Sequence, residues 1–434
     1  MRKSKLWLPL ASTSTALVLV GCSGPPTVPE DPHAALLAAP DPAQEAERML
    51  LAVLPPVVPN PIAGQAAFNQ PLSALFPNVK TNGRSCASCH ILSAGFTLSP
   101  KFTKALFATN PTDPLITAAL ADAGPDVTQA EILARLKDQA LIRVNLKNPW
   151  YNAALGAAPD NPSDLRFWRS VPTAINSGRA QPIFFTKPGT HTQTKGTIMW
   201  DLREPTLEQQ AVDASRGHAQ AISFFSRNLA VDVAEHERKA LAIPATLYKT
   251  TPIKPKLAPG HTNPADPAFG APLFTLATAN QQFLPSTPLT PGTPAWRGFQ
   301  LFLGTPAQPK CITCHNMPET LAGGTMVNRS AGVSELNKTS FPLVTFKLKD
   351  AGGSFHTVTT ADPGVAVTTG RYEDLNTFKV PQLRGLAKFD RFFHDNNATN
   401  LQEAVRHYKD GLPALFGDLK GNEVNDIAAF LAIL

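Results

Sequence analysis

Two short cysteine–histidine motifs carry the clearest chemical signal in this sequence. Cys86–His90 and Cys311–His315 both read C-x-x-C-H, and the only other cysteine is Cys22. This is the attachment pattern of haem c, in which both thiols bond to the haem and the histidine binds its iron. We therefore expect two covalently bound haem c groups, held by Cys86, Cys89, His90, Cys311, Cys314 and His315.

Three other interpretations of the cysteine pairs fit less well. A structural zinc site needs four ligands in one cluster, and neither pair has a further thiol nearby in the sequence. A structural disulfide does not require a histidine at the same offset twice. A redox-active C-x-x-C would be expected beside a β-α-β pattern, and none is visible.

The N-terminus has the pattern of an export signal. Met1–Lys5 is basic, Leu6–Val20 is mostly apolar, and Leu19–Cys22 resembles the lipobox of bacterial lipoproteins. We expect a lipoprotein signal peptide over residues 1–21, lipidation of Cys22, and a Pro/Ala-rich tether over residues 22–62. The alternative is an ordinary cleaved signal with an incidental cysteine. Ser23 resembles the residue that sorts lipoproteins to the outer membrane of Gram-negative bacteria, so a periplasm-facing, lipid-anchored protein is predicted.

The composition narrows the class of protein. Of the 434 residues, 43% are hydrophobic, only 17% are charged, and 42 are proline. No stretch approaches about 18 uninterrupted apolar residues, which argues against a multi-pass membrane protein. Three of the positive charges behind the net charge of +6 lie in the signal segment, at Arg2, Lys3 and Lys5. The charge therefore gives no reason to expect a nucleic-acid partner.

The elements that would position the motifs are mostly helical. Trp296–Leu303 has helical spacing and breaks at Gly304, just before the second motif. Val424, Ile427, Leu431 and Leu434 predict an amphipathic C-terminal helix. Residues 250–295 are rich in Pro and Thr and read as a connection. The prediction is a mainly α protein with two cytochrome c-like haem domains, residues 63–285 and 290–434, and long Pro-rich loops.

Six further segments resemble the di-haem cytochrome c peroxidase/MauG family, in the family's order, from about residue 63 onward. They are Arg169–Thr173, Trp200–Glu204, Leu207–Ala211, Phe378–Leu386, Phe392–Asp395 and Leu401–Tyr408. The resemblance implies that the N-terminal haem reacts with peroxide and that the C-terminal haem relays electrons. It also implies that Trp200 lies between the haems and shortens the electron hop. The alternative for Trp200 is a core aromatic at a domain junction.

The resemblance implies a distal pocket built around the segment after Trp200. Thr206–Gln209 has a capping-box pattern that starts a helix, and Gly217 suits its end. Gln210 occupies the family's distal glutamine position. Gln220 stands where these peroxidases place a catalytic glutamate, and an amide cannot carry the proton that a carboxylate can. His218 is the nearest titratable replacement, with a hydrogen-bonded structural histidine as the alternative.

The sequence also bears on the axial ligands and on calcium. No histidine lies between His90 and His191, and no methionine lies there before Met199, so an open first iron is predicted. His191 falls in a polar turn and is expected in solvent. The resemblance places Tyr408 as the sixth ligand of the second haem, on the same helical face as Leu401, Val405 and Leu412. His407 and Met326 remain alternatives, whereas Met317 is too close to His315. The family's calcium positions hold Ser170 and Phe389, so calcium is not expected.

Three functions follow. The first is a peroxidase that reduces hydrogen peroxide with electrons from a small periplasmic donor, a cytochrome or a cupredoxin. The second is a MauG-like or oxygenase-like enzyme that oxidises another substrate through a high-valent haem. The third is a di-haem electron carrier without catalysis, which the open first iron and Gln210 disfavour.

Overall fold

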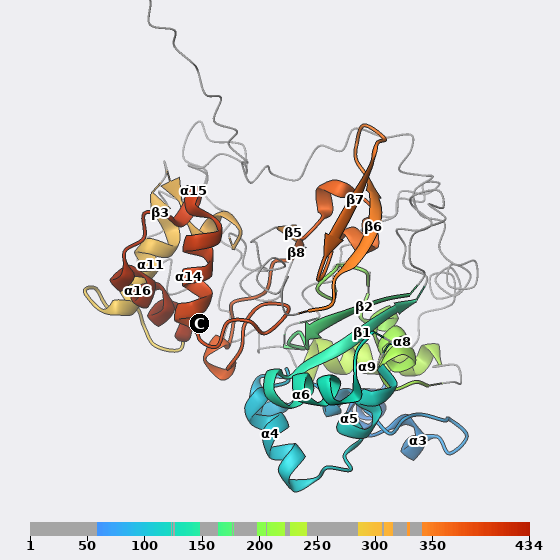
Figure 1. Cartoon of the computed structure of the whole chain (residues 1–434). Helices are drawn as coiled ribbons and strands as arrows, with labels where there is room; N and C mark the ends of the chain where they lie inside the picture. Colours follow the sequence, from blue (N-terminus) through green and yellow to red (C-terminus); the bar gives the residue numbers. More distant parts are fainter. Residues whose placement is uncertain are drawn as a thin grey trace, which may run out of the picture.

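The computed structural model describes residues 59–122, 124, 126–147, 164–175, 177, 198–204, 206–221, 226–240, 285–305, 308–315, 328–329 and 341–434. These residues form a mainly α protein with a few short antiparallel strands (Figure 1). Cys22, His191, Met317 and Met326 lie outside the described residues, as do the signal peptide, nearly all of the tether and most of residues 250–295. In the described part, no helix combines the length and hydropathy needed to cross a membrane.

Helices α2 (Pro61–Asn69), α8 (Leu207–Gly217) and α9 (Arg227–Ala240) form one packed group, called here the N-terminal helix cluster. Helix α2 crosses α9 at Gly64, where an added Cβ would lie 1.9 Å from the carbonyl oxygen of Asp232. The Asp232 carboxylate also accepts a hydrogen bond from the backbone N–H of Asn60, at 2.6 Å. A glycine is therefore required for the two backbones to come this close.

The C-terminal helix cluster has the same construction. It comprises α11 (Pro294–Leu303), α14 (Leu401–Gly411), α15 (Pro413–Phe416) and α16 (Gly421–Ala432) around one apolar core. An added Cβ at Gly298 of α11 would lie 1.8 Å from the carbonyl oxygen of Asp426 in α16. The Asp426 carboxylate accepts two hydrogen bonds from Arg297, both at 2.8 Å. The crossings in the two clusters thus use a glycine and an aspartate in matching places.

The helices predicted from periodicity are confirmed. Helix α11 ends at Leu303, and Gly304 follows with φ +73°. In α16, Val424, Ile427 and Leu431 are buried in the core, while Leu434 packs on the same core just beyond the helix end. Thr206 caps α8 by accepting a hydrogen bond from the Gln209 N–H, but Gly217 is the last helical residue and His218 follows in right-handed conformation.

Two β-hairpins were not predicted from the sequence. Strand β1 (Leu141–Lys147) pairs with β2 (Asp164–Ser170), and β6 (Val344–Lys349) pairs with β7 (Phe355–Thr360). Leu165 and Phe167 of β2 share an apolar core with Phe346, Leu348 and Val358. The second hairpin therefore packs against the first, beside the N-terminal elements, as Figure 1 shows. The division at residues 285–290 stays a prediction.

A buried ionic group joins β2 to the C-terminal half of the chain. Arg169 donates to both carboxylate oxygens of Asp362, at 2.7 and 2.9 Å, and to Asp201 at 2.6 Å. All three residues are buried. Although burial raises the pKa of Asp201, Arg203 and Arg169 outweigh it and hold that pKa below its usual value. The group fixes the segment after β7 against the end of β2, close to Trp200.

Short elements complete the described fold. They are α3 (Leu72–Leu75), α4 (Pro100–Thr109), α5 (Pro114–Thr117), α6 (Gln129–Gln139), α13 (Ala366–Thr369), β3 (Gly304–Thr305), β4 (Gln308–Pro309), β5 (Asn328–Arg329) and β8 (Phe378–Lys379). Strand β3 pairs with β4, and β5 pairs with β8.

Candidate haem sites

The two C-x-x-C-H motifs adopt the same turn. Each begins with a short 3-10 helix, over Cys86–Ser88 and Cys311–Thr313. In each, the carbonyl of the first cysteine accepts a hydrogen bond from the N–H of the second cysteine and from that of the histidine. The distances are 3.1 and 2.9 Å in the first motif and 3.1 and 3.0 Å in the second. The turn therefore holds two thiols and one imidazole together, the arrangement that covalent haem attachment requires.

The ring of His90 is held by the loop that follows it. Its Nδ1 lies 2.9 Å from the carbonyl oxygen of Phe96, which can only accept, so Nδ1 carries the proton. The loop is closed by pairing between Ile91 and Thr97, with Gly95 at φ +70° and Phe96 at φ +57°. Burial lowers the pKa of His90. A neutral imidazole oriented by its Nδ1–H leaves Nε2 free to bind a metal, as metal-binding histidines do.

Three of the four motif thiols are kept protonated by burial. Burial raises the pKa of Cys86 to about 12, of Cys89 to about 11 and of Cys311 to about 12. A thioether carries neither charge nor proton, so thiols bonded to haem suit these surroundings. The residues present therefore fit haem c.

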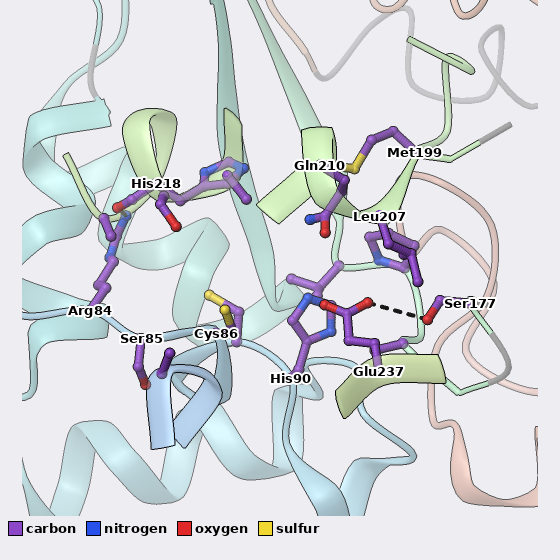
Figure 2. Close-up of a pocket in the computed structure, with 18 of the residues that line it drawn as sticks. Arg84, Ser85, Cys86, His90, Ser177, Met199, Leu207, Gln210, His218 and Glu237 are labelled. Atoms are coloured by element: carbon purple, nitrogen blue, oxygen red, sulfur yellow. Dashed lines mark hydrogen bonds between the residues drawn. The ribbon is translucent and has the colours of Figure 1, made fainter. Parts of the chain in front are cut away.

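A cavity adjoins the first motif. Cys86, Cys89 and His90 line it together with Gln210 and His218 from α8 and its end, and Met199, Arg84 and Glu237 also contribute. Figure 2 shows the side chains of His90, Gln210 and His218 pointing into this shared space. The structure thus brings two of the predicted distal residues to the same side of the cavity, facing the predicted iron ligand.

His218 does not behave as an ordinary titrating histidine. Burial lowers its pKa to about 3, and the charges of Arg203, Arg84 and His90 act in the same direction. The imidazole is therefore neutral at physiological pH. It can donate or accept a hydrogen bond, but the pKa near 6.5 assumed from the sequence does not apply. Both arginines are paired with carboxylates, Arg84 with Asp122 at 2.7 Å and Arg203 with Asp201 at 2.9 Å.

Glu237 is a cavity residue that the sequence did not point to. It lies on α9, is 6% exposed, and accepts a hydrogen bond from Ser177 at 3.2 Å. Burial raises its pKa to about 7. The family resemblance points to position 220 for a carboxylate. Glu237 reaches the cavity only because α9 packs against α2, and no local spacing in the sequence marks it.

Two other predicted site residues, Gln220 and Trp200, are not among the residues that line the cavity. Gln220 adopts φ +51° after the end of α8, and the cavity is lined by its neighbour Ala219 rather than by Gln220 itself. The Nε1–H of Trp200 donates to the carbonyl of Ser170 at 3.1 Å, and the Trp200 carbonyl accepts from Lys379 at 2.9 Å. Trp200 thus joins the end of β2 to β8, between the N-terminal elements and the C-terminal segment.

The second motif lies beside α14. Tyr408 packs on the apolar core of the C-terminal helix cluster together with Leu401, Val405 and Leu412, as the helical spacing predicts. Burial raises the pKa of Tyr408, and Cys314 and Cys311 add to the effect. Its ring makes edge contacts with Phe393 and Phe416, at centroid distances of 5.9 and 6.0 Å. His407 contacts Phe393 as well, at 4.9 Å.

Comparison with known proteins agrees with the motifs. The chain is 31% identical over 137 residues to the cytochrome c551 peroxidase of Nitrosomonas europaea. This match agrees with the resemblance of the sequence motifs to the di-haem cytochrome c peroxidase/MauG family. The match covers 32% of this chain and about a third of that relative, 33%. No family model matches the chain.

Two solved structures overlap most of the chain at low similarity. One is a MauG-like protein associated with microbial copper homeostasis, with a TM-score of 0.40 and 17% identity, covering 88% of this chain and 94% of that one. The other is a single-residue variant of the dihaem peroxidase BthA from Burkholderia thailandensis, with a TM-score of 0.36 and 16% identity, covering 87% of each chain.

Proposed function

We propose that the chain is a di-haem c-type oxidoreductase that reduces hydrogen peroxide at the His90 site. The observation that carries the proposal is the cavity in which Gln210 and His218 face the Cys86–His90 motif. In the reaction, one peroxide takes up two electrons and two protons and its O–O bond breaks to give two waters. Bound haem would supply the iron for this step at His90 and an electron store at His315.

The cavity residues would bind and orient peroxide. The Gln210 amide can donate through its N–H₂ and accept through its carbonyl oxygen, so it can hold either peroxide oxygen. His218, neutral at physiological pH, can accept a hydrogen bond from peroxide through one nitrogen or donate one through the other. Glu237, with a pKa of about 7, is the cavity group able to exchange a proton with solvent near neutral pH.

Electrons would enter from a small periplasmic cytochrome or cupredoxin at the C-terminal domain, residues 290–434, and pass to the N-terminal domain, residues 63–285. Trp200 would carry the hop, supported by its hydrogen bonds to Ser170 and to β8. Lipidation at Cys22 would tether the protein to the outer membrane. A calcium ion is not part of this proposal, since the Ser170 hydroxyl already donates to the Phe393 carbonyl at 3.0 Å.

A second candidate is MauG-like oxidation of another substrate. Tyr408 beside the second motif favours it, because a hard phenolate ligand stabilises ferric and higher states more than a thioether does. A pure electron carrier has less support, since a carrier has no use for a cavity beside the iron ligand that also presents Gln210 and His218.

The test is turnover by the purified protein carrying both haems. We expect hydrogen peroxide to be consumed rapidly in the presence of a reduced small cytochrome and slowly without it. Peroxide-dependent oxidation of another substrate with no acceleration by the cytochrome would favour the MauG-like function. No reaction in either assay would contradict both.

A further inference from the structure

His218 is held in place by the segment that leads into the first haem motif. The side-chain Nδ2 of Asn82 donates to the carbonyl oxygen of His218 at 2.9 Å, and Nη1 of Arg84 donates to the same oxygen at 3.3 Å. The backbone N–H of Asn82 donates to the carbonyl of Ala219 at 3.0 Å. Three hydrogen bonds therefore join residues 82–84 to the peptide that carries His218.

These bonds satisfy carbonyls that lie just beyond the end of α8. Within its last turn, the carbonyls of Ala214 and Ser215 accept from the N–H groups of His218 and Ala221, at 2.8 and 3.0 Å. The carbonyl of His218 instead takes its donors from residues 134 and 136 positions earlier in the chain. The cation of Arg84 also complements the negative end of the helix dipole.

Asn82 and Arg84, called here the Asn82–Arg84 clamp, are themselves held in place. The Asn82 side-chain oxygen accepts from the Arg84 N–H at 3.1 Å, across Gly83 at φ +86°. Arg84 is 3% exposed, and its guanidinium also donates to Asp122 at 2.7 Å and to the carbonyls of Pro114 and Leu115. Every nitrogen of the group is used, so the clamp has little freedom to move.

We propose that Asn82 and Arg84 are positioning residues that fix the His218 imidazole over the cavity at a set place relative to the Cys86–His90 motif. Because Arg84 precedes Cys86 by two positions, the residues on both sides of the cavity share one anchor. A ligand bound there meets the imidazole without the α8 terminus having to rearrange. The inference rests on the proposed haem site at His90 and does not depend on which substrate is turned over.

The test isolates one hydrogen bond. Asn82→Asp keeps the oxygen that accepts from Arg84 and replaces the amide donor facing His218. Asn82→Ala removes both and serves as a second variant. Asn422→Asp makes the same chemical change at an exposed position of α16 and is the matched control. Cyanide binding to the ferric holoprotein is measured for the wild type, for each variant, and for each in a His218→Ala background.

We expect Asn82→Asp to raise the cyanide dissociation constant about fivefold to tenfold, which corresponds to about 1 kcal/mol. Hydrogen exchange at residues 214–221 should quicken in the same variant. In the His218→Ala background the cyanide effect should vanish, because the clamp acts through the imidazole. An equal effect in both backgrounds, or no effect in either, would overturn the inference. Failure to turn over peroxide would count against the proposed function alone, since none of these measurements requires turnover.

Discussion

The ring of Phe68 lies against the imidazole of His90, with the centroids 6.1 Å apart, and Phe302 repeats the contact at His315 with 6.4 Å. Each phenylalanine stands one helical turn after the glycine at which its helix crosses a partner helix. Each also contacts a ring on that partner at 5.3 Å, which is His236 in one cluster and Phe430 in the other. The two motifs therefore share the same helix-crossing arrangement. The polar residues that line the cavity at the first motif are not part of that shared arrangement.

Cofactor content is the first prediction. Two attachment motifs with the same turn geometry should give two covalent haems per chain, measured by pyridine haemochrome assay and intact mass. Replacing Cys86 and Cys89 by serine should remove one haem and leave the other. One haem or none in the wild type would contradict the assignment.

The second prediction concerns the iron at His90. No histidine or methionine follows His90 closely in the sequence, and a cavity adjoins the motif, so we expect a high-spin or weakly water-ligated ferric haem that binds cyanide or azide without prior reduction. A low-spin ferric spectrum that ignores both anions would be the opposite result and would favour the carrier. His218→Ala and Met199→Leu would then identify the blocking residue, because both side chains line the cavity.

Tyr408→Phe tests the second iron. If the phenol oxygen is an axial ligand, the variant should change the magnetic circular dichroism of the His315 haem and raise its reduction potential, because a hard anionic ligand is lost. Tyr372→Phe is the matched control, since Tyr372 is exposed and stacks on His356. An unchanged spectrum and potential in Tyr408→Phe would turn attention to His407 or Met326.

Glu237 should make stability depend on pH. Between about pH 4.5 and 7 the unfolded chain releases this proton while the folded chain keeps it, so the free energy of unfolding falls as pH rises through that range. Glu237→Gln has no carboxylate to ionise, so it avoids this loss. The free energy of unfolding of the variant minus that of the wild type should therefore be larger at pH 8 than at pH 4.5, by on the order of 3 kcal/mol at most. Chemical denaturation at both pH values measures the difference. Glu373→Gln, at an exposed position, should show none.

The helix crossing in the C-terminal cluster gives a fifth prediction. Gly298→Ala would place a methyl group 1.8 Å from the Asp426 carbonyl, so the helices must separate. We expect a loss of about 1–3 kcal/mol in the free energy of unfolding, measured by denaturation. Gly421→Ala meets nothing within 4 Å and should change stability by less than about 0.5 kcal/mol. Equal effects of the two changes would contradict the close crossing.

Local signals predicted well those features that depend on local sequence. The apolar spacing of α11 and α16 and the Thr206 cap follow from a few neighbouring residues, and the structure confirms them. Both hairpins were missed, because β1 alternates only weakly and the core it shares with Phe346 and Leu348 lies some 200 residues further along the chain.

In the candidate site, too, some residues follow from local sequence patterns and others only from contacts between distant segments. Cys86–His90 is a local pattern that five consecutive residues are enough to identify. Glu237 and the Asn82–Arg84 clamp reach the cavity only through contacts between distant segments, and neither has a spacing that marks it. The pKa of His218 could not be predicted either, because it depends on burial and on arginines supplied by other segments.

The two helix crossings also constrain the order in which an emerging chain can assemble. The contact between Asn60 and Asp232 spans 172 positions, and that between Arg297 and Asp426 spans 129. In a chain that emerges from its N-terminus, Cys86–His90 is therefore exposed before α9 can pack on α2. The same holds for Cys311–His315 before α16 can pack on α11. Each cluster can close only after its last helix has emerged.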